Sequence, residues 1–195
     1  MNNRTKSFAF FVLAVILAAV LLAACSPAAS SGITFPKAGI KLTLPREWHA
    51  LGERSGAKFT EAQKAELEGL GNPALVVMCP SESTDQFTDN LVVFFFEEDK
   101  TLFTNSREDN EALLTEGLDE VVVKDYEVIT KWDRDTLHIL YTFTSGEKTF
   151  RVDQYLVNKN GRLYNLTFTA DAKTYSDNQA EMMKLFGSIE FIDIE

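Results

Sequence analysis

The chain has 195 residues, of which 45% are hydrophobic and 25% are charged, and its formal net charge is −10. This length suits one domain, and two cysteines are too few for a disulfide-stapled scaffold. A single long apolar run excludes a multi-pass membrane protein. Residues 25–195 hold 17 basic and 29 acidic side chains, a net charge of −12, which argues against nucleic acid and anionic lipid as binding partners.

The amino terminus has the layout of a secretory signal. Arg4 and Lys6 precede the uncharged apolar run 8–24, which is 17 residues long, and small residues follow it. The residues Leu22-Ala23-Ala24-Cys25 at its end resemble the lipobox of bacterial lipoproteins. In that family the cysteine thiol receives a diacylglyceryl group and the signal is cut just before it, here between Ala24 and Cys25. The alternative is an uncleaved transmembrane helix that ends in cysteine by chance.

The lipobox divides the chain into a signal peptide over 1–24, a lipidated Cys25 with a short tether over 25–32, and one domain over 33–195. The tether reaches about 25 Å when fully extended, so the domain stays near its membrane. We expect the domain to be anchored on the extracytoplasmic side of the cell membrane, or at the outer membrane if the host has one. Cys79 then has no cysteine partner, and a buried, inert thiol is favoured over a reactive one because no neighbouring residue supplies a positive charge or a base.

The first half of the domain predicts a hairpin, a helix and two strands. Residues 33–35 and 40–44 form the hairpin, followed by a turn over 45–48. A capping box at Thr60 and Gln63 starts a surface helix that ends at Gly71. The predicted strands cover 74–79 and 91–96. The second strand shows no alternation, which indicates a sheet covered on both faces.

The second half predicts a helix, a four-stranded antiparallel meander and a closing helix. Ser106, with Asp109 placed for a reciprocal cap, begins a helix that ends near residue 118. Period-two alternation then extends from about 121 to 169, with turns at Ser145-Gly146 and Asn160-Gly161. A helix over about 173–186 and a strand over 189–192 complete the chain.

Three segments of this pattern resemble PsbP-like domains, of the kind found in DcrB-type lipoproteins and in the photosystem II extrinsic protein. They are Gly39-Ile40-Lys41-Leu42-Thr43-Leu44-Pro45-Arg46-Glu47-Trp48, Gly161-Arg162-Leu163-Tyr164-Asn165-Leu166-Thr167-Phe168 and Met182-Met183-Lys184-Leu185-Phe186-Gly187-Ser188-Ile189-Glu190-Phe191. The resemblance implies an α+β fold, an antiparallel sheet with helices on both faces in an α/β/α sandwich. It implies little about activity, because the family includes assembly and accessory proteins and shows no shared catalytic residues.

The sequence offers few groups for catalysis or metal binding. His49 and His138 are the two histidines, and G-x-S-x-G, H-E-x-x-H and CxxC motifs are absent. His138 alternates with Ile139 and is expected to be a packing or surface residue. The acidic segments 97–99 and 133–135 suit a hard cation, but solvated charge at strand ends explains them as well. No cofactor and no metal are expected.

Trp48, His49 and Trp132 are the candidate surface for a partner or ligand, because they lie at loop or strand-end positions. Core packing is the competing explanation for both tryptophans. These features together favour a non-catalytic, lipid-anchored extracytoplasmic accessory or binding domain that contacts an unidentified envelope protein and assists assembly. The alternative is a lipoprotein that binds a small molecule or a metal, and an enzyme is the least favoured class.

Overall fold

The antiparallel meander forms the main part of the fold in the computed structural model, which describes residues 32–46, 48–51, 74–79, 89–97 and 106–193. Its strands are β6 (Asp119–Lys131), β7 (Arg134–Ser145), β8 (Lys148–Lys159) and β9 (Arg162–Asp171). The predicted meander is therefore confirmed. The signal, the lipobox and the helix expected after Thr60 lie outside the described residues.

Three further strands extend the meander into a seven-stranded sheet. They are β3 (His49–Leu51), β4 (Leu75–Met78) and β5 (Asn90–Glu97), and the strand order is β3-β4-β5-β9-β8-β7-β6. All pairs are antiparallel, and β5 lies against β9 with Leu91 opposite Phe168. Leu91, Val92 and Val93 are all buried, so this stretch is covered on both faces, as its unbroken apolar pattern predicts.

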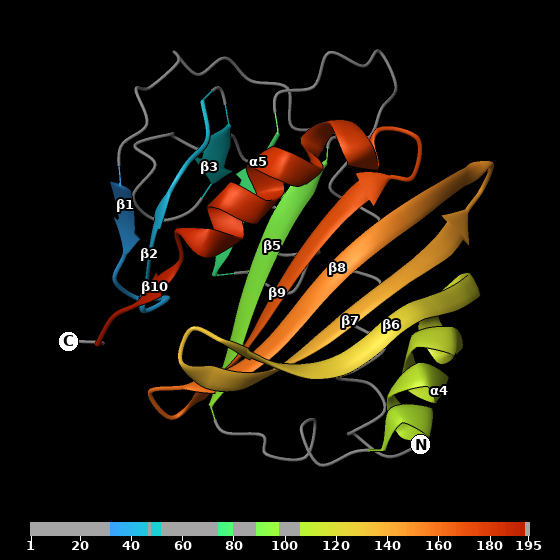
Figure 1. Ribbon diagram of the computed structural model, residues 1–195, viewed down its shortest axis with the longest axis horizontal. Helices are drawn as coiled ribbons and strands as arrows, with labels where there is room; N and C mark the ends of the chain where they lie inside the picture. Colours follow the sequence, from blue (N-terminus) through green and yellow to red (C-terminus); the bar gives the residue numbers. More distant parts are fainter. Residues whose placement is uncertain (1–31, 47, 52–73, 80–88, 98–105, 194–195) are drawn as a thin grey trace, which may run out of the picture.

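A small second sheet stands beside the large one (Figure 1). It contains β1 (Gly32–Phe35), β2 (Ile40–Thr43) and β10 (Glu190–Phe191), in the order β1-β2-β10. The predicted hairpin and closing strand are both present, and they pair with each other through β2 and β10. The Ser188 hydroxyl accepts a hydrogen bond from the Thr43 backbone N–H at 3.0 Å, which fixes the exit from the last helix onto β2.

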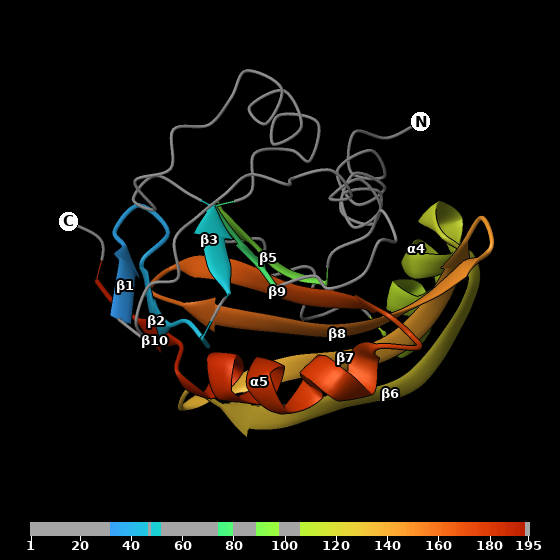
Figure 2. The ribbon, with the colours of Figure 1, turned by 90° about the horizontal axis from the view of Figure 1, so that it is seen from above.

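Two described helices lie on opposite faces of the large sheet. Helix α4 (Arg107–Gly117) begins with the predicted capping box, in which Ser106 and Asp109 bond to each other's backbone N–H. Helix α5 (Tyr175–Gly187) lies on the concave side of the strongly curved sheet (Figure 2). Within the described part of the chain, no helix combines the length and apolar character needed to cross a membrane.

The sheet separates two hydrophobic clusters. On the α5 side, Tyr164, Leu166 and Phe168 of β9 pack with Met182, Leu185 and Phe186 of the helix. On the α4 side, apolar residues of β7 and β8 pack with two leucines near the end of α4: Leu114, Leu118, Leu137, Ile139, Tyr141, Phe143, Phe150, Val152 and Leu156. The α+β architecture with helices on both faces is therefore the one expected from the sequence.

Several hairpin turns place residues in the left-handed region, and two of them concern the fold most. Asn160 and Gly161 have φ values of 52° and 75°, as an Asn-Gly hairpin turn requires. Trp132 and Asp133 have φ values of 54° and 57° at the β6–β7 turn, although neither is glycine. A tryptophan in this conformation is strained, so its side chain must make contacts that compensate for the strain.

Candidate functional site

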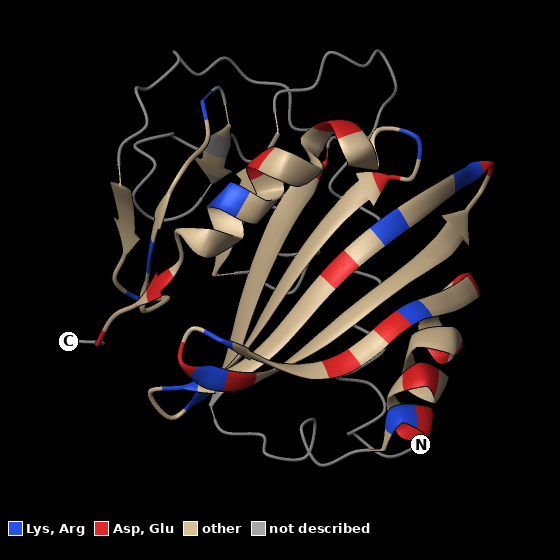
Figure 3. Cartoon of the chain, viewed as in Figure 1, with Lys and Arg blue, Asp and Glu red and all other residues tan. Residues whose placement is uncertain are grey.

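Helix α5 covers only part of the concave face. It lies over β5 and β9, while β8, β7 and β6 extend beyond it (Figure 1). We call this uncovered part the open face, defined by the side chains Asp125, Glu127, His138, Leu140, Thr142 and Arg151. Figure 3 shows acidic and basic residues along both β6 and β8.

His138 lies at the centre of a row of polar groups on the open face. Strand register places Glu127 and Tyr155 directly opposite it on the two neighbouring strands. Its Nε2 lies 2.8 Å from Oδ1 of Asp153, and its Nδ1 lies 3.4 Å from Oε1 of Glu127. The imidazole also stacks on the Tyr155 ring, with centroids 4.6 Å apart. Both ring nitrogens therefore face carboxylates, an arrangement that a doubly protonated imidazolium satisfies.

Asp153 connects this row to the helix. It is 4% exposed, and its second carboxylate oxygen accepts a hydrogen bond from the hydroxyl of Tyr175, the first residue of α5. The Arg151 guanidinium lies over the Tyr175 ring, with its central carbon 4.0 Å from the centroid. The chain Glu127–His138–Asp153–Tyr175 thus extends from the edge strand β6 to the start of α5.

The environment shifts the proton affinities of these groups. Burial alone would lower the pKa of His138, but the hydrogen bonds and negative charges of Asp153 and Glu127 outweigh it and raise the pKa above its ordinary value of 6.5. Burial, together with Asp153, raises the pKa of both Tyr155 and Tyr175. Burial lowers the pKa of Lys131, with Asp153 opposing the change. At neutral pH the two tyrosines act as neutral hydroxyl groups.

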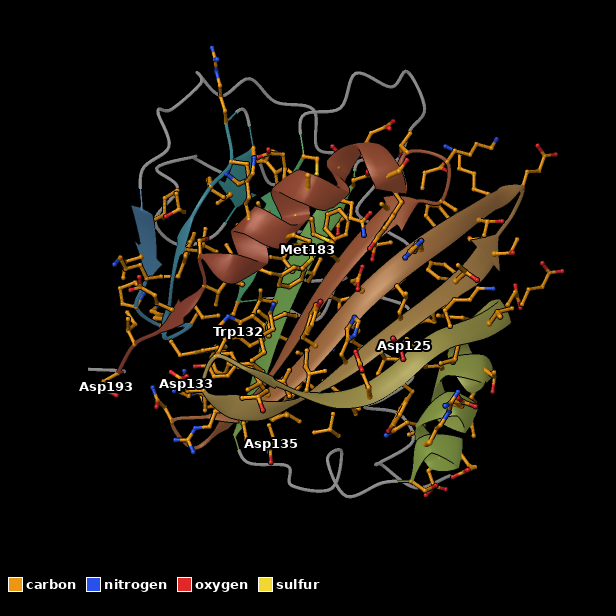
Figure 4. The ribbon with its side chains drawn as sticks, in the orientation of Figure 1. Asp125, Trp132, Asp133, Asp135, Met183 and Asp193 are labelled. Carbon is orange, nitrogen blue, oxygen red and sulfur yellow. The ribbon has the colours of Figure 1, made fainter. Side chains whose placement is uncertain are left out.

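An aromatic cluster closes one end of the open face, at the β6–β7 hairpin. The Trp132 indole Nε1 donates a hydrogen bond to the Phe186 carbonyl oxygen at 3.2 Å, and the ring meets Tyr155 and Phe191 edge-on. The Lys131 ammonium lies 5.0 Å from the Trp132 ring centroid. Figure 4 shows Trp132 at the end of the hairpin and Asp125 further along β6. Trp132 therefore fastens the hairpin to the end of α5.

The residues proposed from the sequence as a partner surface do not form one group. Trp48 is 5% exposed and stacks on Phe168 in the core, which agrees with the alternative of core packing. Trp132 is half-buried and makes the contacts described above. His49 begins β3, but its side chain lies outside the described residues, as do Ala24 and Cys25. Cys79 is a buried free thiol, as expected.

The sequence reasoning missed the environment of His138. It placed His138 on a sheet face with Leu140 and Thr142, but it did not align that face with Glu127 and Asp153. Once both hairpin turns beside β7 are located, counting residues outward from them places Glu127 and Tyr155 opposite His138, because each turn fixes the register of its hairpin.

The arrangement limits the chemistry that His138 can perform. A general base needs a ring nitrogen directed at a substrate proton, whereas both nitrogens here face carboxylates. Within the described part of the chain, the one hydroxyl group that is hydrogen-bonded to the Glu127–His138–Asp153 row is that of Tyr175. A metal ion is a second possibility, because one ligand atom each from Asp125, Glu127 and His138 lies within 4.8 Å of the others.

Comparison with known proteins identifies the fold. No protein-family model matches the sequence, and no curated protein sequence matches it. The solution structure of cyanobacterial PsbP (CyanoP) from Synechocystis aligns with a TM-score of 0.53 and 12% identity, over 87% of this chain and 98% of that chain. The crystal structure of LpqN, involved in cell envelope biogenesis of Mycobacterium tuberculosis, aligns with a TM-score of 0.53 and 12% identity, over 86% of this chain and 90% of that one. The chain therefore has a PsbP-like fold, as the sequence resemblance implies.

Proposed function

We propose that this chain is a non-catalytic accessory domain, held by a lipid on Cys25 at the extracytoplasmic side of a bacterial membrane, where it binds an envelope protein and assists assembly. The lipobox Leu22–Cys25 supports the location. The fold likeness to LpqN, a protein involved in cell envelope biogenesis, supports the class of role. The observation that carries the non-catalytic part is His138, whose two ring nitrogens are both engaged by carboxylates.

The open face is the part of the domain best suited to hold the partner. Leu140 and Thr142 are partly exposed on it, between charged groups of both signs. Mixed apolar and polar surface of this kind is typical of interfaces that form and separate, whereas obligate interfaces are more apolar. It lies on the ordered strands β6, β7 and β8, so a partner would meet a surface that needs little ordering on binding.

Site-specific photo-crosslinking in the host tests this proposal. A photoreactive residue replaces Asp125, which is exposed on the open face, and in a matched chain it replaces Glu116, which is exposed on α4. We expect one stoichiometric protein adduct from position 125 and none from position 116. Equal yields at both positions, or no adduct at 125 from the membrane-anchored chain, would contradict the proposal.

Metal binding is the second candidate function, and the cluster Asp125, Glu127 and His138 favours it. Two carboxylates and one imidazole suit Zn²⁺ or Mn²⁺. The native mass spectrum of the chain purified from its own host separates the two candidates. Metal binding adds a discrete mass that Asp125→Asn removes, whereas a partner-binding domain shows the mass of the lipidated chain alone.

A further inference from the structure

The open face is as wide as one helix. Helix α5 lies over β5 and β9, and the six side chains that define the open face, on β8, β7 and β6, are all at least partly exposed (Figure 1). Neighbouring strands are about 4.8 Å apart, so these three strands span about 10 Å, the diameter of a helix with its side chains. The central strand of the open face, β7, lies two strands from β9, which matches the spacing of about 8–10 Å between the axes of packed helices. A second helix therefore fits on the concave face beside α5.

Three side chains of the open face form a diagonal with a positive and a negative end. Arg151 of β8 is opposite Thr142 of β7, which lies two residues after Leu140 on that strand. Glu127 of β6 is opposite His138, which lies two residues before Leu140. Two strand spacings of about 4.8 Å and four residues of about 3.4 Å separate Arg151 from Glu127, a distance of about 17 Å between their Cα atoms. Leu140 lies at the midpoint of this diagonal.

The positive end of the diagonal is held in place without a carboxylate partner. The Arg151 guanidinium lies over the Tyr175 ring, with its central carbon 4.0 Å from the centroid. Its Nε is buried without a hydrogen-bond partner in the described part of the chain, where no ion pair includes Arg151. A guanidinium presents its N–H donors in a planar fork that matches a carboxylate. Arg151 therefore suits a carboxylate that a partner supplies.

The other end of the diagonal is negative, and the part between the ends is apolar. Glu127 is half-exposed and uses one carboxylate oxygen to contact the imidazole, and the exposed Asp125 lies two residues before it on the same face. The two carboxylates attract a basic residue of a partner. Between the ends, Leu140 is partly exposed, and Val122, which lies opposite Thr142, is 48% exposed.

A helix suits this face better than an extended segment does. Strands β7 and β8 already pair on both sides, so an extended segment laid across them would leave its own backbone N–H and C=O groups without strand partners. A helix satisfies these groups internally and offers only its side chains to the face.

We propose that the open face binds an amphipathic helix of the partner protein, with an acidic residue over Arg151, apolar residues over Leu140 and Val122, and a basic residue over Glu127. This inference rests on the partner binding proposed above and adds the chemistry of the partner. At 1.5 Å per residue, a distance of about 17 Å corresponds to about 11 residues, or three turns. The acidic and the basic residue therefore lie on the same face of the partner helix, at positions i and i+11.

Photo-crosslinking from two positions of the open face tests the shape of the partner segment. A photoreactive phenylalanine derivative replaces Val122 or Asp125 in the full-length, membrane-anchored chain in its host, and mass spectrometry of each adduct locates the joined residue of the partner. Measured along the diagonal, the two positions are about 6 Å apart. We expect the joined residues of the partner to be three or four apart in its sequence, one turn of a helix, whereas an extended segment would give one or two.

Charge variants test the positive end of the diagonal. Arg151→Gln removes the charge, and we expect it to lower the adduct yield from position 125 about fivefold. Arg107→Gln is the matched control, because Arg107 also lies over a tyrosine ring, that of Tyr126, and belongs to α4 on the other face of the sheet. It should leave the yield unchanged.

A charge exchange separates a lost ion pair from a damaged fold. Once the adducts have identified the partner helix, Arg151→Glu is combined with a lysine in place of the acidic residue that faces it, which should restore the yield to within about twofold. A yield that stays low in this combination, or that Arg151→Gln does not lower, would overturn the inference and leave the proposed function standing. Joined residues one or two apart, or an adduct with a second copy of this chain, would overturn it as well. No adduct from either position would contradict the proposed function itself, and this inference with it.

Discussion

Replacing Trp132 by alanine tests whether this residue is a structural clamp or a surface for a partner. The indole donates a hydrogen bond to the Phe186 carbonyl oxygen at 3.2 Å. Its ring meets Tyr155 and Phe191 edge-on, with centroids 5.8 and 5.6 Å away. It thus joins the β6–β7 hairpin to the end of α5 and to β10. Removing the ring breaks these attachments together, without touching any hydrogen bond between two backbone groups.

The expected loss follows from these contacts. The hydrogen bond contributes about 1 kcal/mol, and each edge-on aromatic pair contributes about 0.5–1.5 kcal/mol beyond the area that it buries. Since Trp132 is half-buried, the loss from burial is smaller than for a core aromatic. We expect Trp132→Ala to lower the free energy of unfolding by about 3 kcal/mol. For a domain of this size, that corresponds to a fall in Tm of roughly 6–12 °C.

A second substitution at the same position isolates the backbone contribution. Trp132 has a φ of 54°, where a side chain with a Cβ costs about 1–2 kcal/mol and glycine pays no such penalty. We therefore expect Trp132→Gly to be about 1 kcal/mol more stable than Trp132→Ala. At Thr130, an exposed position inside β6, the order should reverse, because glycine weakens a regular strand relative to alanine.

Urea unfolding of the full-length chain in micelles measures both effects. Trp48 reports on unfolding in the Trp132 variants, because it is buried against Phe168. A loss below about 0.5 kcal/mol in Trp132→Ala, the range of an ordinary surface substitution, would refute the clamp. It would also restore the interpretation of Trp132 as a partner surface. Alanine more stable than glycine at position 132 would refute the backbone argument alone.

Three further predictions concern the anchor, the buried thiol and a helix cap. Cys25→Ala should abolish lipid labelling and block signal removal, as seen by metabolic labelling and intact mass; a processed, membrane-bound variant would contradict the lipobox interpretation. In a Cys25→Ser chain, Cys79 should react with iodoacetamide only after denaturation, because burial raises the pKa of its thiol and excludes the reagent; labelling of the folded chain would contradict this. Ser106→Ala should lower the free energy of unfolding by about 1 kcal/mol through loss of the Asp109 capping box, whereas Ser176→Ala, at an exposed position in α5, should be nearly neutral in the same urea titration.

The parts of the fold that the sequence predicts correctly are set by local chemistry. Ser106 and Asp109 cap a helix through contacts three residues apart, and Asn160-Gly161 specifies a hairpin turn by itself. Pairing between distant segments carries no such local signature. Neither the position of β5 against β9 nor that of β10 against β2 could be predicted, because each pairs segments that lie far apart in the sequence.

The Glu127–His138–Asp153 row is neither a purely local feature nor a pairing of distant segments. Its members belong to neighbouring hairpins, so their alignment is local once the turns are located. The β6–β7 turn cannot be located from the sequence. Its left-handed positions, usually glycine or asparagine, are occupied by Trp132 and Asp133. The contacts of Trp132 with α5 and β10 offset the backbone strain of this turn. These contacts involve segments more than 50 residues away. The register of the row is therefore encoded partly by tertiary packing.

The edge of the sheet bears on how a partner would approach. Strand β6 forms this edge, and its pairing with β7 is interrupted by register shifts between Asp119 and Val122 and between Val123 and Asp125. Such irregularities and exposed charges oppose the addition of another strand. A partner is therefore expected on the open face, whose border includes the start of α5.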